Sequence, residues 1–225
     1  MKKLTAIFVA SVFSLTAGAA SAVTINAADE ANGLNGGGGE RAELDNYVWN
    51  NANTGGLAVT LTGFTSSGST EGVPYFDSAT GGLGVCGVPY PAGGGGITQA
   101  DLDALGGGTG DCGSDDSLQS GESVTMSFGG SVTITNLMFN DHGNSLSGKN
   151  VRISADGYAG ADYSFDTVGG ETFANVSWIT FSYATNNGNR FYFESASVNP
   201  IPLPAGAVLM LTGLGGLAIA RRRRK

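Results

Sequence analysis

The C-terminal end of the chain sets the strongest limit on what can fold, because it joins an apolar segment to a cluster of cations. Residues 205–220 carry no charged side chain. The cluster that follows them consists of Arg221, Arg222, Arg223, Arg224 and Lys225. Such a segment stops during export with its cations on the cytoplasmic side of the inner membrane. We therefore expect everything before it to lie outside that membrane.

The apolar segment is short for a stable membrane span. As a helix it would extend about 24 Å at 1.5 Å per residue, whereas the hydrocarbon core is about 30 Å thick. Pro202 and Pro204 resist helix formation just before it. The pattern predicts a hydrophobic helix that holds the chain in the membrane transiently and presents an extended Pro-rich strip outside. A permanent single-pass anchor is the alternative.

The N-terminal end has the features of a secretory signal peptide. Lys2 and Lys3 precede a mostly apolar run over residues 4–17, and small residues follow at Ala20 and Ala22. A signal peptidase accepts small residues at these two positions before its cleavage site. We expect cleavage between Ala22 and Val23, and an uncleaved anchor is the alternative.

These two ends divide the chain into three parts. Residues 1–22 form the predicted signal peptide, residues 23–199 an exported domain, and residues 200–225 a sorting signal. The middle part is long enough for one domain with a substantial core and too short for two comfortable ones.

Removal of both ends would make the exported domain strongly anionic. The whole chain has a formal charge of −8, with 11 lysines and arginines against 19 carboxylates. Seven of the cations lie in the two ends and every carboxylate lies between them, so the domain would carry −15. Such a surface repels nucleic acid and anionic lipid and favours cations or neutral ligands. We exclude nucleic acid as a partner.

Glycine content and alternating polarity predict an all-β domain. Glycine accounts for 38 of 225 residues, and apolar and hydroxyl side chains alternate along residues 57–62 and 123–128, as in half-buried strands. Further strands follow at short intervals. The expected strands of the second half are residues 122–128, 131–139, 150–155, 162–166, 176–183 and 190–198. This spacing predicts an antiparallel β-sandwich of jelly-roll-like type.

Local signals refine this prediction. Gly129 and Gly130 suit a two-residue hairpin loop, and a change in apolar parity predicts a β-bulge near Asn136. Residues 98–105 predict one short helix, because Thr98 and Asp101 fit a capping box. Residues 82–87 match the G-x-G-x-x-G pattern of dinucleotide sites, but no helix start follows, so we expect a turn there.

The two cysteines of the chain are Cys86 and Cys112, and both lie in the exported part. Outside the cytoplasm we expect them to form one disulfide. The disulfide would close the long loop that contains the predicted helix.

Acidic residues gather beside the second cysteine. They are Asp111, Asp115 and Asp116, followed by Glu122 at the start of a predicted strand. Carboxylate oxygens on a stapled loop could hold one structural Ca²⁺, and extracellular calcium sites tolerate weak affinity. A solvated acidic loop is the alternative.

The Pro-rich strip, the apolar segment and the basic cluster together resemble a known sorting signal. The strip reads Ile201, Pro202, Leu203, Pro204, Ala205. It resembles the VPLPA variety of the PEP-CTERM signal of Gram-negative bacteria, with Ile201 where that motif usually has valine. The resemblance implies recognition by an exosortase-type membrane peptidase, removal of the tail, and association with exopolysaccharide at the cell surface or in secreted form.

No residue pattern identifies a reaction, so we expect a non-enzymatic protein with a structural or ligand-binding role in the extracellular polymer or biofilm layer. His142 is the single histidine, and no serine stands in a nucleophile-elbow motif. Two alternatives stay open. A carbohydrate-binding module would use exposed aromatic platforms, for which the candidates are Trp49, Tyr75, Phe76, Tyr90, Tyr158 and Tyr192. A glycoside hydrolase would need only two suitably spaced carboxylates.

Overall fold

The computed structural model describes residues 21–66, 70–78, 81–89, 97–104, 117–141, 144–184 and 190–201. All of them belong to one compact unit, Ser21–Ile201. Most of the predicted signal peptide and nearly all of the predicted sorting signal lie outside the described residues, so both stay predictions. Within the described ranges, no helix is long and apolar enough to cross a membrane.

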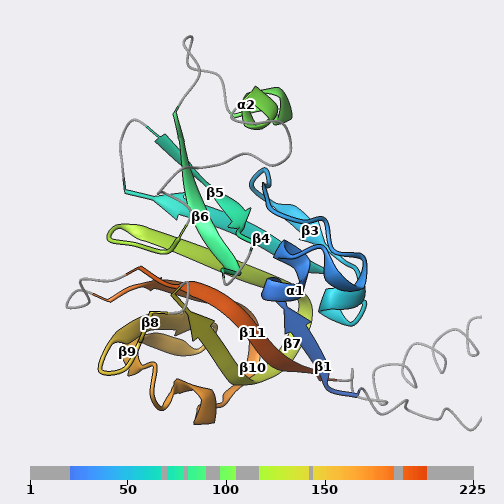
Figure 1. Cartoon of the computed structure of the whole chain (residues 1–225). Coiled ribbons are helices and arrows are strands. Elements are labelled where there is room, and N and C mark those ends of the chain that lie inside the picture. The colour runs from blue at the N-terminus through green and yellow to red at the C-terminus, as the bar shows by residue number, and fades with distance from the viewer. Residues whose placement is uncertain are drawn as a thin grey trace, which may run out of the picture. The chain divides into compact units, whose positions relative to one another are not determined.

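The described domain is built mainly of antiparallel strands, as the sequence predicts (Figure 1). The strands are β1 (Val23–Asn26), β2 (Arg41–Ala42), β3 (Tyr47–Trp49), β4 (Val59–Thr65), β5 (Thr70–Phe76), β6 (Leu83–Pro89), β7 (Glu122–Asn140), β8 (Asn150–Ala155), β9 (Tyr158–Ser164), β10 (Phe173–Tyr183) and β11 (Tyr192–Pro200). The helices are α1 (Ala27–Ala31) and α2 (Gln99–Ala104), with 3₁₀ turns η1 (Leu34–Gly36), η2 (Ala52–Thr54) and η3 (Val168–Gly170).

One hydrogen-bonded network joins all the strands of the described ranges. Its main path is β2-β5-β6-β11-β7-β10-β8-β9, while β1 pairs with β11, and β4 pairs with both β3 and β7. In Figure 1, β8 to β11 gather at one end of the domain, and β3, β5 and β6 lie at the other.

Strand β7 is the centre of this network. Its first half pairs with β4, its second half pairs with β11, and β10 accompanies both halves. The predicted bulge is confirmed, because Thr135 faces Ser197 while Met138 faces Ser195, which leaves one extra residue in β7. Asn136 lies at this point with a φ of 52°, a conformation that asparagine tolerates better than most side chains.

The predicted hairpin at Gly129 and Gly130 is wrong, because β7 continues through both glycines. The buried side chains Phe128 and Val132 have the same parity on either side of them. A two-residue hairpin would have placed Phe128 opposite Ser131 and so mixed the apolar and polar faces. The continuous alternation therefore outweighs the turn preference of the glycine pair.

The expected turn at residues 82–87 is also wrong, because most of this segment belongs to β6. Leu83 and Val85 join the main core, whereas Cys86 and Val88 join a second core. A strand that is buried on both faces shows no alternation of polarity. The sequence pattern therefore did not predict β6.

The short helix is confirmed as α2, one residue shorter than expected at each end. Its capping box is present: the Asp101 carboxylate accepts from the Thr98 N–H at 2.8 Å, and Thr98 Oγ1 accepts from the Asp101 N–H at 3.4 Å. Leu102 packs in the second core with Val73, Tyr75 and Cys86.

Strands β4 and β5 approach so closely that only glycine fits at their crossing. A Cβ atom added to Gly63 would lie 2.7 Å from the carbonyl carbon of Val73, and one added to Gly72 would meet the backbone of Phe64 and Thr65. Backbone cannot move aside as a flexible side chain can, so the two glycines set the distance between these strands.

Replacing Gly63 with alanine is expected to lower the free energy of unfolding by about 2 kcal/mol, since overpacking a tight site costs roughly 1–3 kcal/mol. Urea denaturation followed by circular dichroism measures this. The matched control is Gly129→Ala, where a Cβ atom meets nothing within 4 Å. The control should stay within about 0.5 kcal/mol of the wild type, and equal losses in the two variants would contradict the close crossing.

Candidate functional site

The predicted calcium ligands are only partly within the described residues. Asp111, Asp115 and Asp116 lie outside them. Glu122 begins β7 and is 5% exposed, and its carboxylate accepts from the backbone N–H of Gln119 at 2.9 Å. Glu122 thus closes the turn that leads into β7. Across the ranges that the structure describes, no group of three or more acidic, histidine or cysteine side chains could hold a metal ion, so calcium stays a prediction.

Cys86 is buried in the second core and does not carry a free thiol. Its expected partner Cys112 lies outside the described residues, so the pairing stays a prediction. The other site residues of the sequence analysis fall at the ends of the domain. Val23 opens β1, and Ile201 directly follows β11, whereas residues 202–225 are not described.

Most of the proposed aromatic platforms belong to the core. Trp49, Phe76 and Tyr192 are fully buried, and Tyr75 is 1% exposed. Tyr158 is half-buried, and its hydroxyl accepts from the backbone N–H of Ala174 at 2.9 Å. Tyr90 lies outside the described residues. The buried aromatics cannot stack on a glycan at the surface, so a binding site would need other residues.

One buried carboxylate collects hydrogen bonds from five groups that the sequence analysis did not connect. Glu30 at the end of α1 is fully buried. Its donors are Arg41 Nη2 at 2.7 Å, the Gly38 N–H at 2.9 Å, Trp49 Nε1 at 3.1 Å, Asn51 Nδ2 at 2.6 Å and Asn53 Nδ2 at 2.9 Å. The cluster joins α1, the loop after η1, β2, β3 and η2.

Arg41 connects this cluster to the aromatic core. Its guanidinium lies 4.8 Å from the centre of the Phe76 ring, and it also pairs with Glu43. A guanidinium over an aromatic face keeps a favourable electrostatic contact while it loses water. The arginine therefore bridges two carboxylates and the rings of Phe76 and Tyr47.

The hydrogen bonds decide the charge of Glu30. Burial raises its pKa, but the bonds from Asn53, Asn51, Gly38 and Arg41 outweigh burial and lower the pKa from 4.5 to about 2. For Glu43, burial also raises the pKa, and Arg41 opposes the increase. A general acid must be protonated near neutral pH and must reach its substrate. Glu30 meets neither condition, so this cluster stabilises the fold.

Because the folded pKa of Glu30 lies below its unfolded value, its contribution to stability is complete above about pH 4.5. It is lost as the pH falls toward 2. We expect this contribution to be about 3 kcal/mol. In urea denaturation between pH 6 and pH 2.5, the wild type should lose most of this advantage over Glu30→Gln.

The control for this experiment is Glu171→Gln, a change at an exposed carboxylate. It should follow the wild type at every pH. A Glu30→Gln variant that is as stable as the wild type at pH 6 would refute the assignment.

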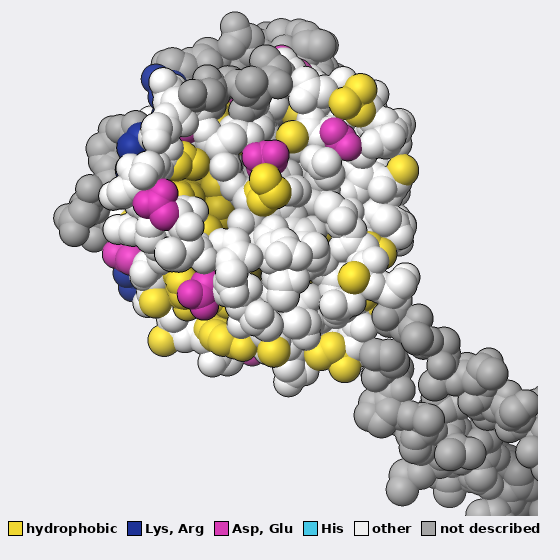
Figure 2. Space-filling model, turned by 60° about the horizontal axis from the view of Figure 1, so that its bottom comes forward, with side chains coloured by type: hydrophobic (Ala, Val, Ile, Leu, Met, Phe, Trp, Pro, Cys, Tyr) yellow, Lys and Arg dark blue, Asp and Glu magenta, His cyan; other side chains and the backbone are white. Residues whose placement is uncertain are grey.

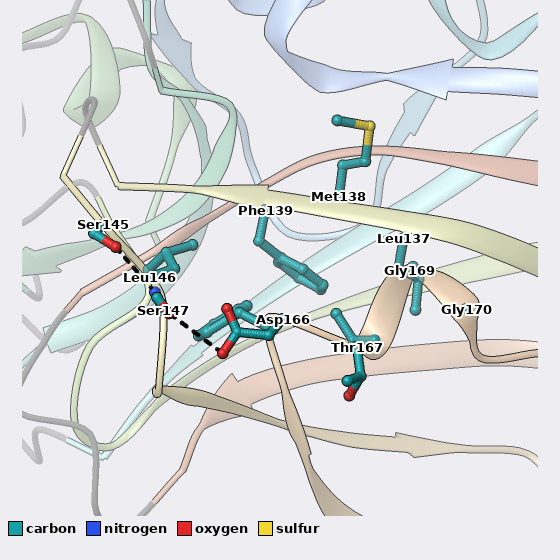
Figure 3. Close-up of a pocket in the computed structure, with 12 residues that line it drawn as sticks. Leu137, Met138, Phe139, Ser145, Leu146, Ser147, Asp166, Thr167, Gly169 and Gly170 are labelled. Atoms are coloured by element: carbon teal, nitrogen blue, oxygen red, sulfur yellow. Dashed lines mark hydrogen bonds between the residues drawn. The ribbon is translucent and has the colours of Figure 1, made fainter.

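The second candidate site is a groove of about 440 Å³ between β7, residues 145–147 and residues 165–170 (Figure 3). Pairing of β8 with β9 creates it. Asn150 faces Ser164 at the end of this ladder, and the Phe165 N–H donates to the Lys149 carbonyl at 3.0 Å. The segment before β8 is therefore held beside the turn after β9.

The floor of the groove is apolar, and the bulge in β7 shapes it. After Asn136 the inward parity changes, so that Leu137 is buried and Phe139 packs against the main core. Phe165 meets Phe139 edge to face, with ring centres 5.2 Å apart. Val168 of η3 is 1% exposed and closes the other side.

The rim of the groove is polar. Asp166 Oδ2 accepts from the Gly148 N–H at 3.0 Å and from the Ser147 hydroxyl at 3.5 Å. Ser145 and Thr167 add two further hydroxyl groups. Figure 3 marks the hydrogen bond between Ser147 and the Asp166 carboxylate at this rim. The arrangement combines an apolar floor with hydroxyls and one carboxylate, which suits a small polar ligand.

Sequence reasoning missed both places. Arg41 is one of only four cations in residues 23–199, and this scarcity is the signal that could have directed attention to a buried partner. For the groove, the parity change at Asn136 was visible, but the turn that closes the groove was not.

One view of the surface shows how dispersed its charges are. In Figure 2, the carboxylates lie apart from one another, while hydrophobic side chains gather in a recess on the left and along the lower edge. Comparison with protein-family models, with curated proteins and with solved structures found no match.

Proposed function

We propose that the chain is an exported protein of a Gram-negative bacterium, sorted to the cell surface or released by a PEP-CTERM signal of the VPLPA variety. Its domain has a structural or ligand-binding role in the extracellular polymer layer. Signal peptidase removes residues 1–22, and an exosortase-type peptidase removes the tail. The chain meets the inner membrane transiently through its C-terminal helix, and it stays anchored there if the tail is retained.

The observation that carries this proposal is the pairing of β1 with β11. Val23, the expected first mature residue, lies opposite Val198, two residues before the end of β11 at Pro200. Cleavage before Val23 and after Pro200 therefore removes no residue of a described strand. The two ends of the domain lie side by side on one ladder, so the domain is a self-contained cargo between two removable segments.

The finer architecture belongs to the same proposal. We assign the antiparallel strands to a jelly-roll-like β-sandwich. The proposal includes a disulfide between Cys86 and Cys112 and a structural Ca²⁺ held by Asp111, Asp115, Asp116 and Glu122.

The groove supports a binding role over a hydrolase. Asp166 is the carboxylate among the described residues that line it, and a hydrolase of the two-carboxylate type needs a second one about 5–10 Å away. Glu30 and Glu43 share Arg41 instead, and Glu30 has no exposed surface. We therefore propose a non-enzymatic protein, with a carbohydrate-binding module as the specific alternative within this class.

Intact-mass analysis of the protein from its native host tests the sorting proposal. We expect the mature chain to begin at Val23 and to lack the basic cluster, because both peptidases act during export. The variant with Pro202→Ala and Pro204→Ala should keep its tail, since its strip can continue the helix. Thr212→Ala, inside the apolar segment, is the matched control and should be processed normally.

A wild-type chain that keeps residues 221–225 would remove the processing claim. The same spectra, recorded with and without a chelator under native conditions, test the metal. Loss of one calcium mass on chelation supports the site, and an unchanged mass contradicts it.

A further inference from the structure

The groove between β7, residues 145–147 and residues 165–170 can be assigned a ligand class. We propose that it binds a sugar unit of a neutral polysaccharide. This inference rests on the proposed function, because it assumes that the domain reaches an extracellular polymer. It adds the position of the contact and the charge class of the polymer.

The floor of the groove suits the apolar face of a sugar ring. A pyranose presents C–H groups on its faces and hydroxyl groups around its edge. Phe139 and Phe165 are only partly buried and lie in the groove lining, so each keeps ring surface for contact with a ligand. Aromatic rings bury a large apolar area at a fixed geometry.

The rim suits the hydroxyl groups of the sugar. Asp166 uses Oδ2 for the two bonds that fix the neighbouring loop. Its side chain is exposed, so Oδ1 can accept a hydrogen bond from a ligand hydroxyl. The Ser147 hydroxyl donates to Asp166 and the Thr167 hydroxyl donates to the Ser164 carbonyl, so both can accept from a ligand, while the Ser145 hydroxyl can donate to one. An ionised acceptor makes a stronger hydrogen bond to a hydroxyl than a neutral one.

Charge selects the kind of polymer. The lining contains one carboxylate and, among the described residues, no lysine or arginine. The exported domain as a whole carries −15 after removal of both ends. Polysaccharides that bear carboxylate or sulfate groups would meet repulsion both at Asp166 and from the overall field. A neutral chain avoids this cost and keeps the hydrogen bonds of the rim.

Two glycines, one in the groove lining and one outside it, allow a matched pair of variants that tests binding at the groove. Gly170 lines the groove, and Gly130 lies in β7 outside its lining. A Cβ atom at either position meets nothing within 4 Å, and neither residue has a positive φ. Phenylalanine at Gly170 should obstruct the groove, whereas phenylalanine at Gly130 adds the same side chain elsewhere.

The measurement is affinity electrophoresis of the mature protein, purified from its native host, in native gels that contain dextran, hydroxyethylcellulose, galactomannan or alginate. We expect at least one of the three neutral polymers to retard the wild type and alginate to have no effect. Gly170→Phe should lose the retardation, Gly130→Phe should keep it, and Asp166→Asn should weaken binding about tenfold, the loss of one charge-assisted hydrogen bond.

Several results would overturn the inference: no retardation by any neutral polymer, equal retardation by alginate, or a Gly170→Phe variant that binds like the wild type. Circular dichroism of each variant shows that it is folded. If Gly170→Phe does not fold, the Asp166→Asn variant serves as the test. An Asp166→Asn variant that binds with unchanged affinity would contradict binding at the groove. The outcome is separate from the sorting test, because a correctly processed protein can fail to bind and an unprocessed one can bind.

Discussion

The described domain depends on the continuity of β7. This one strand pairs with β4 along its first half, with β11 along its second half, and with β10 along both. A break at its glycine pair would leave the β4 ladder and the β11 ladder joined only through β10 in the described residues. The bulge at Asn136 then turns Leu137 and Phe139 toward the core and forms one wall of the groove. The same strand therefore holds the domain together and shapes its candidate ligand site.

Sequence patterns predicted those parts of the fold in which one face is buried and the other is wet. The alternation around Val124 and Met126, the capping box at Thr98 and the bulge at Asn136 are local signals, and the structure has all three. The failures have a common cause. Gly129 and Gly130 resemble a turn locally, and β6 is buried on both faces, so their state depends on partners that are distant in the sequence. The members of the Glu30 cluster are also far apart in the sequence, since one of the donors to Glu30 is Asn53.

The two polar sites of the domain differ in whether their carboxylates can still accept a hydrogen bond from a ligand. Glu30 receives five hydrogen bonds and has no exposed surface, so its carboxylate is satisfied within the protein and cannot contact a ligand. Asp166 holds its loop with one oxygen and is exposed. A satisfied buried network fixes a fold, whereas an open rim over an apolar floor can accept a ligand. This contrast is why we propose the groove as the ligand site and assign the N-terminal cluster to stability.

The central claim is that the domain between the two removable ends lies outside the cytoplasm. The most direct measurement is fractionation of the native host, with free thiols alkylated at lysis and detected by mass spectrometry. The account predicts residues 23–199 in the medium or at the cell surface, with Cys86 and Cys112 protected from alkylation until they are reduced. Recovery of the domain in the cytosol with both cysteines alkylated would contradict it.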